Sequence, residues 1–160
     1  MPYDKPSLAL YQPDIAGNTG TLIRLSACLG TRLHIIDPAG FRHDDKALRR
    51  AGMDYTALAT VQRHNDFAAF TVIAEAEKRR IVLATTRAET SHADFTFAAG
   101  DLLLLGRESS GVPDAVHERA DARIAIPMLK EARSINQAVC GAIVLAEALR
   151  QLSAFPEFGN

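Results

Sequence analysis

The chain has no tryptophan, only two cysteines and only 6% aromatic residues among its 160 positions. Two cysteines cannot build the dense disulfide framework of a small secreted protein, so a hydrophobic core must hold the fold together. No apolar run approaches the roughly 18 residues of a membrane span, and the first residues lack the apolar stretch of a signal peptide. The sequence therefore predicts a cytoplasmic protein without a membrane anchor.

The chain also lacks an excess of charge of either sign, because it has 18 basic and 19 acidic residues. A net charge of −1 gives no global attraction to nucleic acid, so RNA binding would need a local basic patch. The five histidines lack the spacing of metal ligands, and no metal site is predicted. Cys28 and Cys140 fall within apolar helical patterns, which predicts free thiols that are buried.

The sequence does contain a regular alternation of strand and helix patterns. Its length and its 48% apolar content predict one globular domain over residues 1–160. Such alternation predicts an α/β fold, with a mostly parallel sheet flanked by helices on both faces. The predicted strands are 7–11, 32–36, 59–62, 81–84, 101–105 and 123–126, and the predicted helices are 18–29 with Asn18 as N-cap, 46–50, 66–79 and 134–152.

The last predicted helix is apolar on nearly every side between Ile135 and Leu152. A helix with two apolar faces needs two partners, and in a small domain the second partner can be another subunit. This pattern predicts a homodimer. The alternative is a central core helix that the chain's own loops cover.

The loop at residues 12–20 joins the first strand to a helix, whose first backbone amides can bind an anion. Arg24 lies further along that helix among apolar residues, where a guanidinium favours a phosphate or carboxylate partner. A surface arginine with its stem along apolar neighbours is the alternative. Asp37 after the second strand also leaves open a Rossmann-type nucleotide site, although Gly17 and Gly20 do not complete its glycine spacing.

Two further loops follow strands. The strand at 101–105 runs into a loop with Glu108 between two glycines, where the backbone can approach a ligand and a carboxylate can bind a cation or a hydroxyl. Ser134 and Asn136 stand at the start of the last helix, where capping is the alternative role. Because ligands in α/β sheets bind beyond the carboxyl ends of strands, these loops predict one shared binding site.

The three loops closely resemble the motifs of the SPOUT superfamily of RNA methyltransferases, in the branch that methylates ribose 2′-hydroxyls. The first motif of that branch pairs an Asn with an Arg, here Asn18 and Arg24. The second is a Gly-x-Glu-x-x-Gly loop, here residues 106–111. The third joins an Ile-Pro-Met strand end, here 126–128, to a Ser-x-Asn helix start, here 134–136.

The resemblance spans residues 8–151, and residues 44–55 indicate one subgroup of the superfamily. That segment is similar to Asp-Asp-Lys-x-Leu-Arg-Arg-Ala-Gly-x-Asp-Tyr of the minimal tRNA wobble-position 2′-O-methyltransferases. Their substrates are leucine tRNAs with C or a modified U at the first anticodon position. The resemblance implies a tRNA substrate, a homodimer, and a C-terminal trefoil knot whose loops bind S-adenosylmethionine, the methyl donor, in a bent conformation.

The resemblance also implies roles for individual residues. The methyl group of S-adenosylmethionine is bonded to a positively charged sulfur, so its transfer neutralises that charge and needs no metal. The enzyme must align the ribose 2′-oxygen with the methyl group and provide a route for the hydroxyl proton. The densest basic cluster is expected to contact RNA and consists of Arg42, Lys46, Arg49 and Arg50. The alternative is a solvated surface on which these residues form ion pairs with Asp44 and Asp45. The predicted groups are Arg24, Glu108 and Asn136 for catalysis, Ala84, Gly106, Ile126, Met128 and Ser134 for the cofactor, and Asn18, Arg42, Lys46, Arg49 and Arg50 for RNA.

Two departures from the family pattern concern this site. Gln137-Ala138 stands where the family commonly has Leu-Ser, which removes a hydroxyl that could contact the methionine carboxylate; Arg107 replaces a usual proline and adds a cation at the site mouth. Arginine is too weak an acid to act readily as a base, so we expect Arg24 to bind RNA phosphate and polarise the hydroxyl. A different RNA target, a Rossmann-like nucleotide enzyme and a non-catalytic RNA-binding module remain as alternatives.

Overall fold

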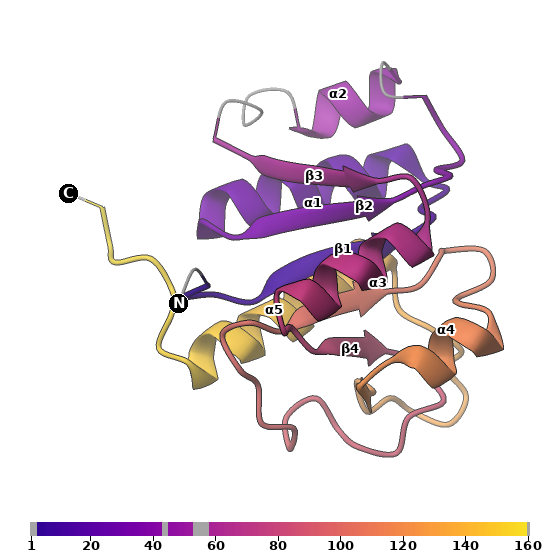
Figure 1. The fold of residues 1–160 in the computed structure, drawn as a ribbon, viewed down its shortest axis with the longest axis vertical. Helices are drawn as coiled ribbons and strands as arrows, with labels where there is room; N and C mark the ends of the chain where they lie inside the picture. The colour runs from indigo at the N-terminus through magenta and orange to yellow at the C-terminus, as the bar shows by residue number, and fades with distance from the viewer. Residues whose placement is uncertain (1–2, 43–44, 53–57, 160) are drawn as a thin grey trace.

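Six parallel strands form one sheet in the order β3-β2-β1-β5-β4-β6 in the computed structural model, which describes residues 3–42, 45–52 and 58–159 (Figure 1). This arrangement confirms the predicted α/β fold with a parallel sheet and flanking helices. The strands are β1 (Ser7–Tyr11), β2 (Arg32–Ile36), β3 (Thr60–His64), β4 (Ile81–Ala84), β5 (Leu102–Leu105) and β6 (Ala122–Ile124). The helices are α1 (Ala16–Leu29), α2 (Lys46–Gly52), α3 (Phe67–Ala76), α4 (Asp114–Arg119) and α5 (Gln137–Gln151).

Two hydrophobic cores lie on opposite faces of the sheet, because side chains alternate along each strand. In β5, Leu103 and Leu105 pack in the core that includes α1 and α5, whereas Leu102 and Leu104 pack in the core that includes α3 and α4. Figure 1 shows α3 in front of the sheet and α1 behind it. Because β5 is buried on both faces, all its side chains must be apolar, which explains the four consecutive leucines.

Helix α5 packs against both the sheet and α1, which accounts for much of its apolar surface. A Cβ on Gly141 would lie 2.9 Å from both the Leu105 side chain and the Leu22 side chain, so α5 approaches β5 and α1 very closely here. Val139, in the first turn, remains 48% exposed. The chain therefore covers one part of the second apolar face itself, and the trefoil knot implied by the resemblance stays a prediction.

Several details of the predicted elements were wrong. Helix α1 begins at Ala16 with Ile15 at the N-cap position, so Asn18 is not its cap. Helix α4 was not predicted, because six residues are too few to establish a helical period. Helix α5 begins at Gln137 rather than 134, since Asn136 caps it, and β6 ends before the predicted residue 126.

The two cysteines are free, but they differ in exposure. Cys28 is exposed on α1, so the prediction that it is buried was wrong. Cys140 is half-buried, and burial raises the pKa of its thiol to about 11. Among the described helices, none has the length and apolar character needed to cross a membrane.

Two buried histidines connect β2 and β3 on the α3 face of the sheet. His34 Nδ1 and His64 Nε2 lie 2.9 Å apart, and both rings pack edge-on against Phe70. Burial lowers the pKa of His34 to about 3, and the nearby positive charges of Arg79 and Arg32 add to this shift. Burial also lowers the pKa of His64, against the opposing charge of Glu77. The folded state therefore holds His34 neutral.

We expect the free energy of unfolding to fall as the pH decreases from 7 to 5. Unfolded His34 takes up a proton near its ordinary pKa of 6.5, whereas folded His34 does so only near 3, so protons favour the unfolded state in this window. His34→Leu should reduce the slope of unfolding free energy against pH by up to about one proton, measured by urea unfolding at each pH. Val72→Ala on the exposed side of α3 should leave the slope unchanged. An unaltered slope in His34→Leu would contradict the assignment.

Candidate active site

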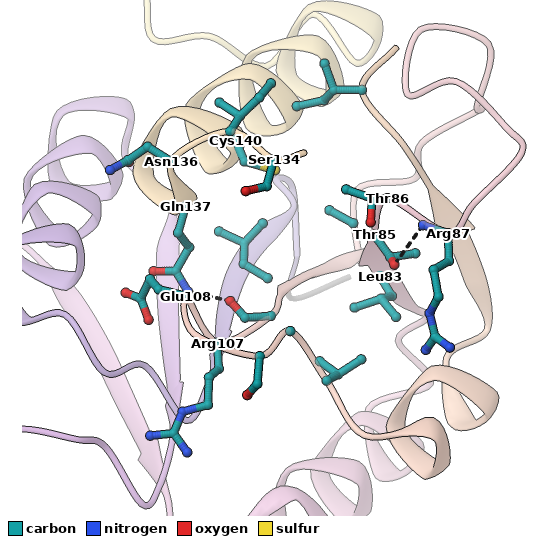
Figure 2. Close-up of a pocket in the computed structure, with 18 of the residues that line it drawn as sticks. Leu83, Thr85, Thr86, Arg87, Arg107, Glu108, Ser134, Asn136, Gln137 and Cys140 are labelled. Carbon is teal, nitrogen blue, oxygen red and sulfur yellow. Dashed lines mark hydrogen bonds between the residues drawn. The ribbon is translucent and has the colours of Figure 1, made fainter. Parts of the chain in front are cut away.

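A cavity of about 610 Å³ lies beyond the carboxyl ends of β4, β5 and β6, next to the start of α5 (Figure 2). This is the edge of a parallel sheet at which ligands bind. The structure thus brings together the second and third loops and part of the first. The cavity is lined by Ile15 and Asn18, by Leu83 to Arg87, by Leu105 to Glu108, by Ser110 to Val112, by Asp114, Ile126 and Met128, and by Arg133 to Gln137 and Cys140.

The loop after β5 is closed by its two glycines. Arg107 N donates to Gly111 O at 3.0 Å, and Gly111 N donates to Arg107 O at 2.8 Å. Gly111 has a φ of +66°, in the left-handed region that favours glycine. A Cβ on Gly106 would lie 2.9 Å from Gly111 Cα, so a larger residue does not fit there. The backbone conformation of this loop therefore requires glycine at both ends of the Gly-x-Glu-x-x-Gly motif.

A chain of hydrogen bonds that begins at Glu108 joins all three loops. Its Oε2 accepts from Asp14 N at 2.9 Å, and its Oε1 accepts from Asn18 Nδ2 at 3.4 Å. Asn136 Nδ2 donates in turn to Asn18 Oδ1 at 3.1 Å. Asn18, predicted as a helix cap and as an RNA contact, thus connects Glu108 to Asn136.

Asn136 has a second role, because the capping alternative is correct for this residue. Its Oδ1 accepts from Ala138 N at 2.8 Å and from Val139 N at 3.3 Å at the start of α5. Ser134 lies on the cavity wall and does not cap the helix. The cap fixes the Asn136 side chain, so that its amide nitrogen is directed to Asn18 in the first loop.

Gln137 is a cavity residue that the sequence reasoning did not assign to the site. Its side chain is buried beside the loop after β5, and Nε2 donates to Gly106 O at 2.8 Å (Figure 2). Its Oε1 is buried without a hydrogen-bond partner among the described residues. The only signal in the sequence was the departure from the family pattern at this position.

Asp14 is the second residue that sequence reasoning missed. Its Oδ2 accepts from Arg107 Nε at 3.3 Å and from Ser109 Oγ. A side-chain hydrogen bond with Glu108 is the main reason why the pKa of Asp14 falls to about 2, with Ser109 and Arg107 as further causes. Burial, followed by the proximity of the Asp14 side chain, raises the pKa of Glu108, against the hydrogen bond that Asp14 N donates. The extra cation at Arg107 is therefore neutralised in part by Asp14.

Arg24 lies outside the cavity of its own chain, on an exposed part of α1. It follows Asn18 by six positions, and at about 100° per residue this places it on a different side of the helix. The exposed location matches the alternative interpretation for an isolated chain. Its predicted catalytic role stays a prediction.

The basic cluster on and before α2 is separate from the cavity. Helix α2 packs against α1, where a Cβ on Gly20 would lie 2.5 Å from Ala51 Cβ, and Figure 1 shows it at the opposite end of the molecule from β4. Lys46, Arg49 and Arg50 are exposed, and Asp45 caps the helix by accepting from Ala47 N at 2.7 Å. Asp44 and residues 53–55 of the subgroup motif lie outside the described residues.

Asp37, the residue that suggested a Rossmann-type site, is engaged elsewhere. Its carboxylate accepts from Arg63 Nε at 3.2 Å and from Ala39 N at 3.2 Å, and it does not line the cavity. This disfavours a nucleotide site of that kind. Within the described ranges, no group of three or more His, Cys, Asp or Glu residues could hold a metal ion.

Comparison with known proteins agrees with the resemblance. The SpoU rRNA Methylase family profile matches residues 5–146. A protein of Ancylobacter novellus, named tRNA (cytidine(34)-2′-O)-methyltransferase, is 58% identical over 96% of this chain and 98% of its own. A protein of the same name from Escherichia coli K12 is 43% identical over 91% of this chain and 93% of its own.

Two solved structures show the same fold. One, from work on 2-OH methylation of C/U34 on tRNA, has a TM-score of 0.87 and 39% identity over 96% of this chain and 99% of its own. The other, the SpoU methyltransferase AviRb of Streptomyces viridochromogenes with AdoMet, has a TM-score of 0.85 and 26% identity over 94% of this chain and 62% of its own. The chain therefore belongs to the SpoU rRNA Methylase family.

Proposed function

We propose that this protein transfers a methyl group from S-adenosylmethionine to the ribose 2′-hydroxyl of nucleotide 34, a cytidine or modified uridine, in leucine tRNAs. The observation that carries the proposal is the 58% identity, over nearly the full length of both chains, to a relative named for this reaction. The cavity at the three motif loops supplies a site for it. A tRNA substrate also agrees with the predicted cytoplasmic location.

The cavity is suited to S-adenosylmethionine. A volume of about 610 Å³ lies in the range of small-molecule sites, and all five predicted cofactor residues line it. These are Ala84, Gly106, Ile126, Met128 and Ser134. The buried, unpartnered Gln137 Oε1 at the same wall shows that the site has acceptor capacity not used within the described residues. When bound, the donor supplies a methyl group on a positively charged sulfur.

In the proposed mechanism, this chain orients the ribose with groups held by the network around Glu108. Asn18 and Asn136 are fixed by their mutual hydrogen bond and hold the first and third loops at the cavity mouth. Arg24 binds an RNA phosphate and polarises the 2′-hydroxyl, because its guanidinium is a permanent donor. Preorganised donors of this kind lower the barrier by stabilising charge that develops in the transition state.

Arg24 reaches the reaction only if a second copy of the chain provides it. Arg24 lies outside the cavity of its own chain. In addition, two apolar side chains beside the cavity are exposed to solvent. Ile15 before α1 is 50% exposed and Val139 at the start of α5 is 48% exposed. A homodimer that covers these residues would bring α1 of one protomer to the cavity of its partner. This supports the predicted homodimer.

Transfer of labelled methyl groups from S-adenosylmethionine to total tRNA, with mapping of the modified nucleotide, tests the proposal. We expect one 2′-O-methylated nucleotide at position 34 of leucine tRNAs. A label at another tRNA or rRNA position would redirect the substrate assignment. Tight tRNA binding without transfer would indicate a non-catalytic RNA-binding module, and protection by NAD alone would indicate a nucleotide enzyme.

The exposed arginines of α2 are proposed to contact the tRNA backbone. Charge reversal of Arg49 and Arg50 should weaken tRNA binding and reduce the salt dependence of the affinity by about two counterions, since each phosphate contact releases about one. Donor binding should stay unchanged, because α2 does not line the cavity. Lys78→Glu, on the chain segment after α3, is the matched control. An unaltered affinity and salt slope would exclude α2 from the RNA interface.

A further inference from the structure

The guanidinium group of Arg107 is held at the mouth of the cavity by one carboxylate. Arg107 lines the cavity in the loop after β5, and its Nε donates to Asp14 Oδ2 at 3.3 Å. Asp14 Oδ2 also accepts from Ser109 Oγ, so the carboxylate is itself fixed. The side chains of Arg107 and Asp14 are only 29% and 19% exposed. Because the pair is partly buried, it orders the guanidinium more than a fully exposed ion pair would.

The other edge of the same guanidinium is available to a ligand. Asp14 contacts only Nε, and among the described residues no hydrogen-bond acceptor pairs with the two terminal nitrogens of Arg107. Figure 2 shows this guanidinium directed away from Gln137 on the cavity wall. The planar fork of an arginine matches two oxygens of a phosphate group. Arg107 therefore presents an ordered edge of unused donors to an anion outside the donor cavity.

The other charged side chains on the cavity wall are arranged differently. Arg87 is 53% exposed and pairs with the exposed Asp114 at 3.1 Å. Arg133, before α5, is exposed as well. Each carboxylate oxygen of Glu108 accepts a hydrogen bond from the first loop, so this carboxylate is not a partner for Arg107. Among the described cavity residues, Arg107 is thus the arginine that a partly buried carboxylate holds in place.

Arg107 also lies beside the segment that leads to the basic cluster on and before α2. A Cβ on Gly40 would lie 3.6 Å from Arg107 Nη2 and 2.8 Å from Asp14 Cβ, so residue 40 lies against both side chains. Gly40 N donates to Pro13 O at 2.8 Å, which fixes this segment to the first loop. Arg42, two positions later, is exposed and begins the basic cluster. Arg107 therefore lies between the cavity and these cations, where a nucleic-acid backbone is the polyanion that fits.

We propose that Arg107 binds a backbone phosphate next to nucleotide 34 of the tRNA and so holds that nucleotide at the cavity mouth. This inference rests on the proposed methyl transfer, because an RNA whose nucleotide 34 enters the cavity leaves the neighbouring phosphates at the entrance. Bases of single-stranded RNA loops are commonly splayed out in this way when proteins bind them. The phosphates on the 5′ and 3′ sides of nucleotide 34 are the two candidates for the contact.

Binding of a leucine tRNA anticodon stem–loop tests this contact, with a neutral methylphosphonate linkage on the 5′ or the 3′ side of nucleotide 34. For the wild type, one of the two linkages should weaken binding about tenfold, the effect of losing one charged hydrogen bond. Arg107→Gln should bind the unmodified RNA about tenfold more weakly and should no longer respond to that linkage. Its salt slope should fall by about 0.7, the value for one phosphate of a single strand.

Arg150→Gln is the matched control, because Arg150 pairs with Glu147 at 2.9 Å but lies in the last turn of α5, whereas the cavity lies next to the first. This variant should keep the wild-type affinity and salt slope, and Arg107→Gln should bind S-adenosylhomocysteine as the wild type does. Equal losses for the wild type and Arg107→Gln with both linkages, or no loss with either, would overturn the phosphate contact. A wild-type protein that shows the expected binding pattern but transfers no methyl group would instead reject the proposed function.

Discussion

Arg24→Ala is expected to reduce methyl transfer to tRNA by about 10²- to 10³-fold, the usual cost of removing one preorganised donor from a transition state. Binding of S-adenosylhomocysteine should be unchanged, because Arg24 does not line the cavity of its own chain. Arg24→Lys should also be strongly impaired, since an ammonium group cannot reproduce the planar fork that binds a phosphate. Single-turnover rates and calorimetry separate the two effects. Nearly full turnover by Arg24→Lys would reject a specific guanidinium role.

Mixing two impaired variants, at a donor concentration too low to fill the Gly106→Ala cavity, tests whether Arg24 acts in the partner protomer. An Arg24→Ala chain keeps its own cavity, whereas a Gly106→Ala chain keeps Arg24 but has a disturbed cavity loop. If Arg24 crosses to the partner, each mixed dimer has one complete site. Random exchange makes about half of the dimers mixed, so about a quarter of wild-type activity should return. Activity that remains at the level of the separate variants would place Arg24 in its own protomer or outside the reaction.

The sequence predicted those features that depend on local periodicity. The run of leucines in β5 and the glycine after α1 are local signals, and both elements were located within one or two residues. The second and third loops and part of the first also came together as expected, because the carboxyl ends of parallel strands share one edge of the sheet. Local patterns therefore defined where the site lies.

Local sequence patterns did not predict the contacts between residues that are far apart in the sequence. Asp14 belongs to the site only because Glu108, 94 positions away, reaches it across the sheet edge. Asn18 has the chemistry of a helix cap, but its amide is used by Glu108 and Asn136 while α1 starts two residues earlier. Polar residues with a plausible local role can thus be recruited by long-range hydrogen bonds, and spacing alone does not distinguish the two cases.

Gly106→Ala should disturb the cavity more than any other single methyl group in the loop after β5. The new Cβ would lie 2.9 Å from Gly111 Cα and 3.0 Å from Gly111 C, both backbone atoms that cannot rotate away. Relief requires opening the paired hydrogen bonds between Arg107 and Gly111, and it displaces the Gly106 carbonyl that holds Gln137. We expect the overpacked loop to lower the free energy of unfolding by about 1–3 kcal/mol.

The same change should weaken S-adenosylhomocysteine binding by at least about tenfold, since a loss of 1.4 kcal/mol is enough for that factor. Calorimetry measures the affinity, and urea unfolding measures the stability of the same samples. Gly17→Ala is the matched control, because nothing lies within 4 Å of its Cβ position and alanine is favoured within a helix such as α1. Unchanged donor affinity in Gly106→Ala would show that the loop after β5 is not part of the donor site, and the cavity would then need another ligand.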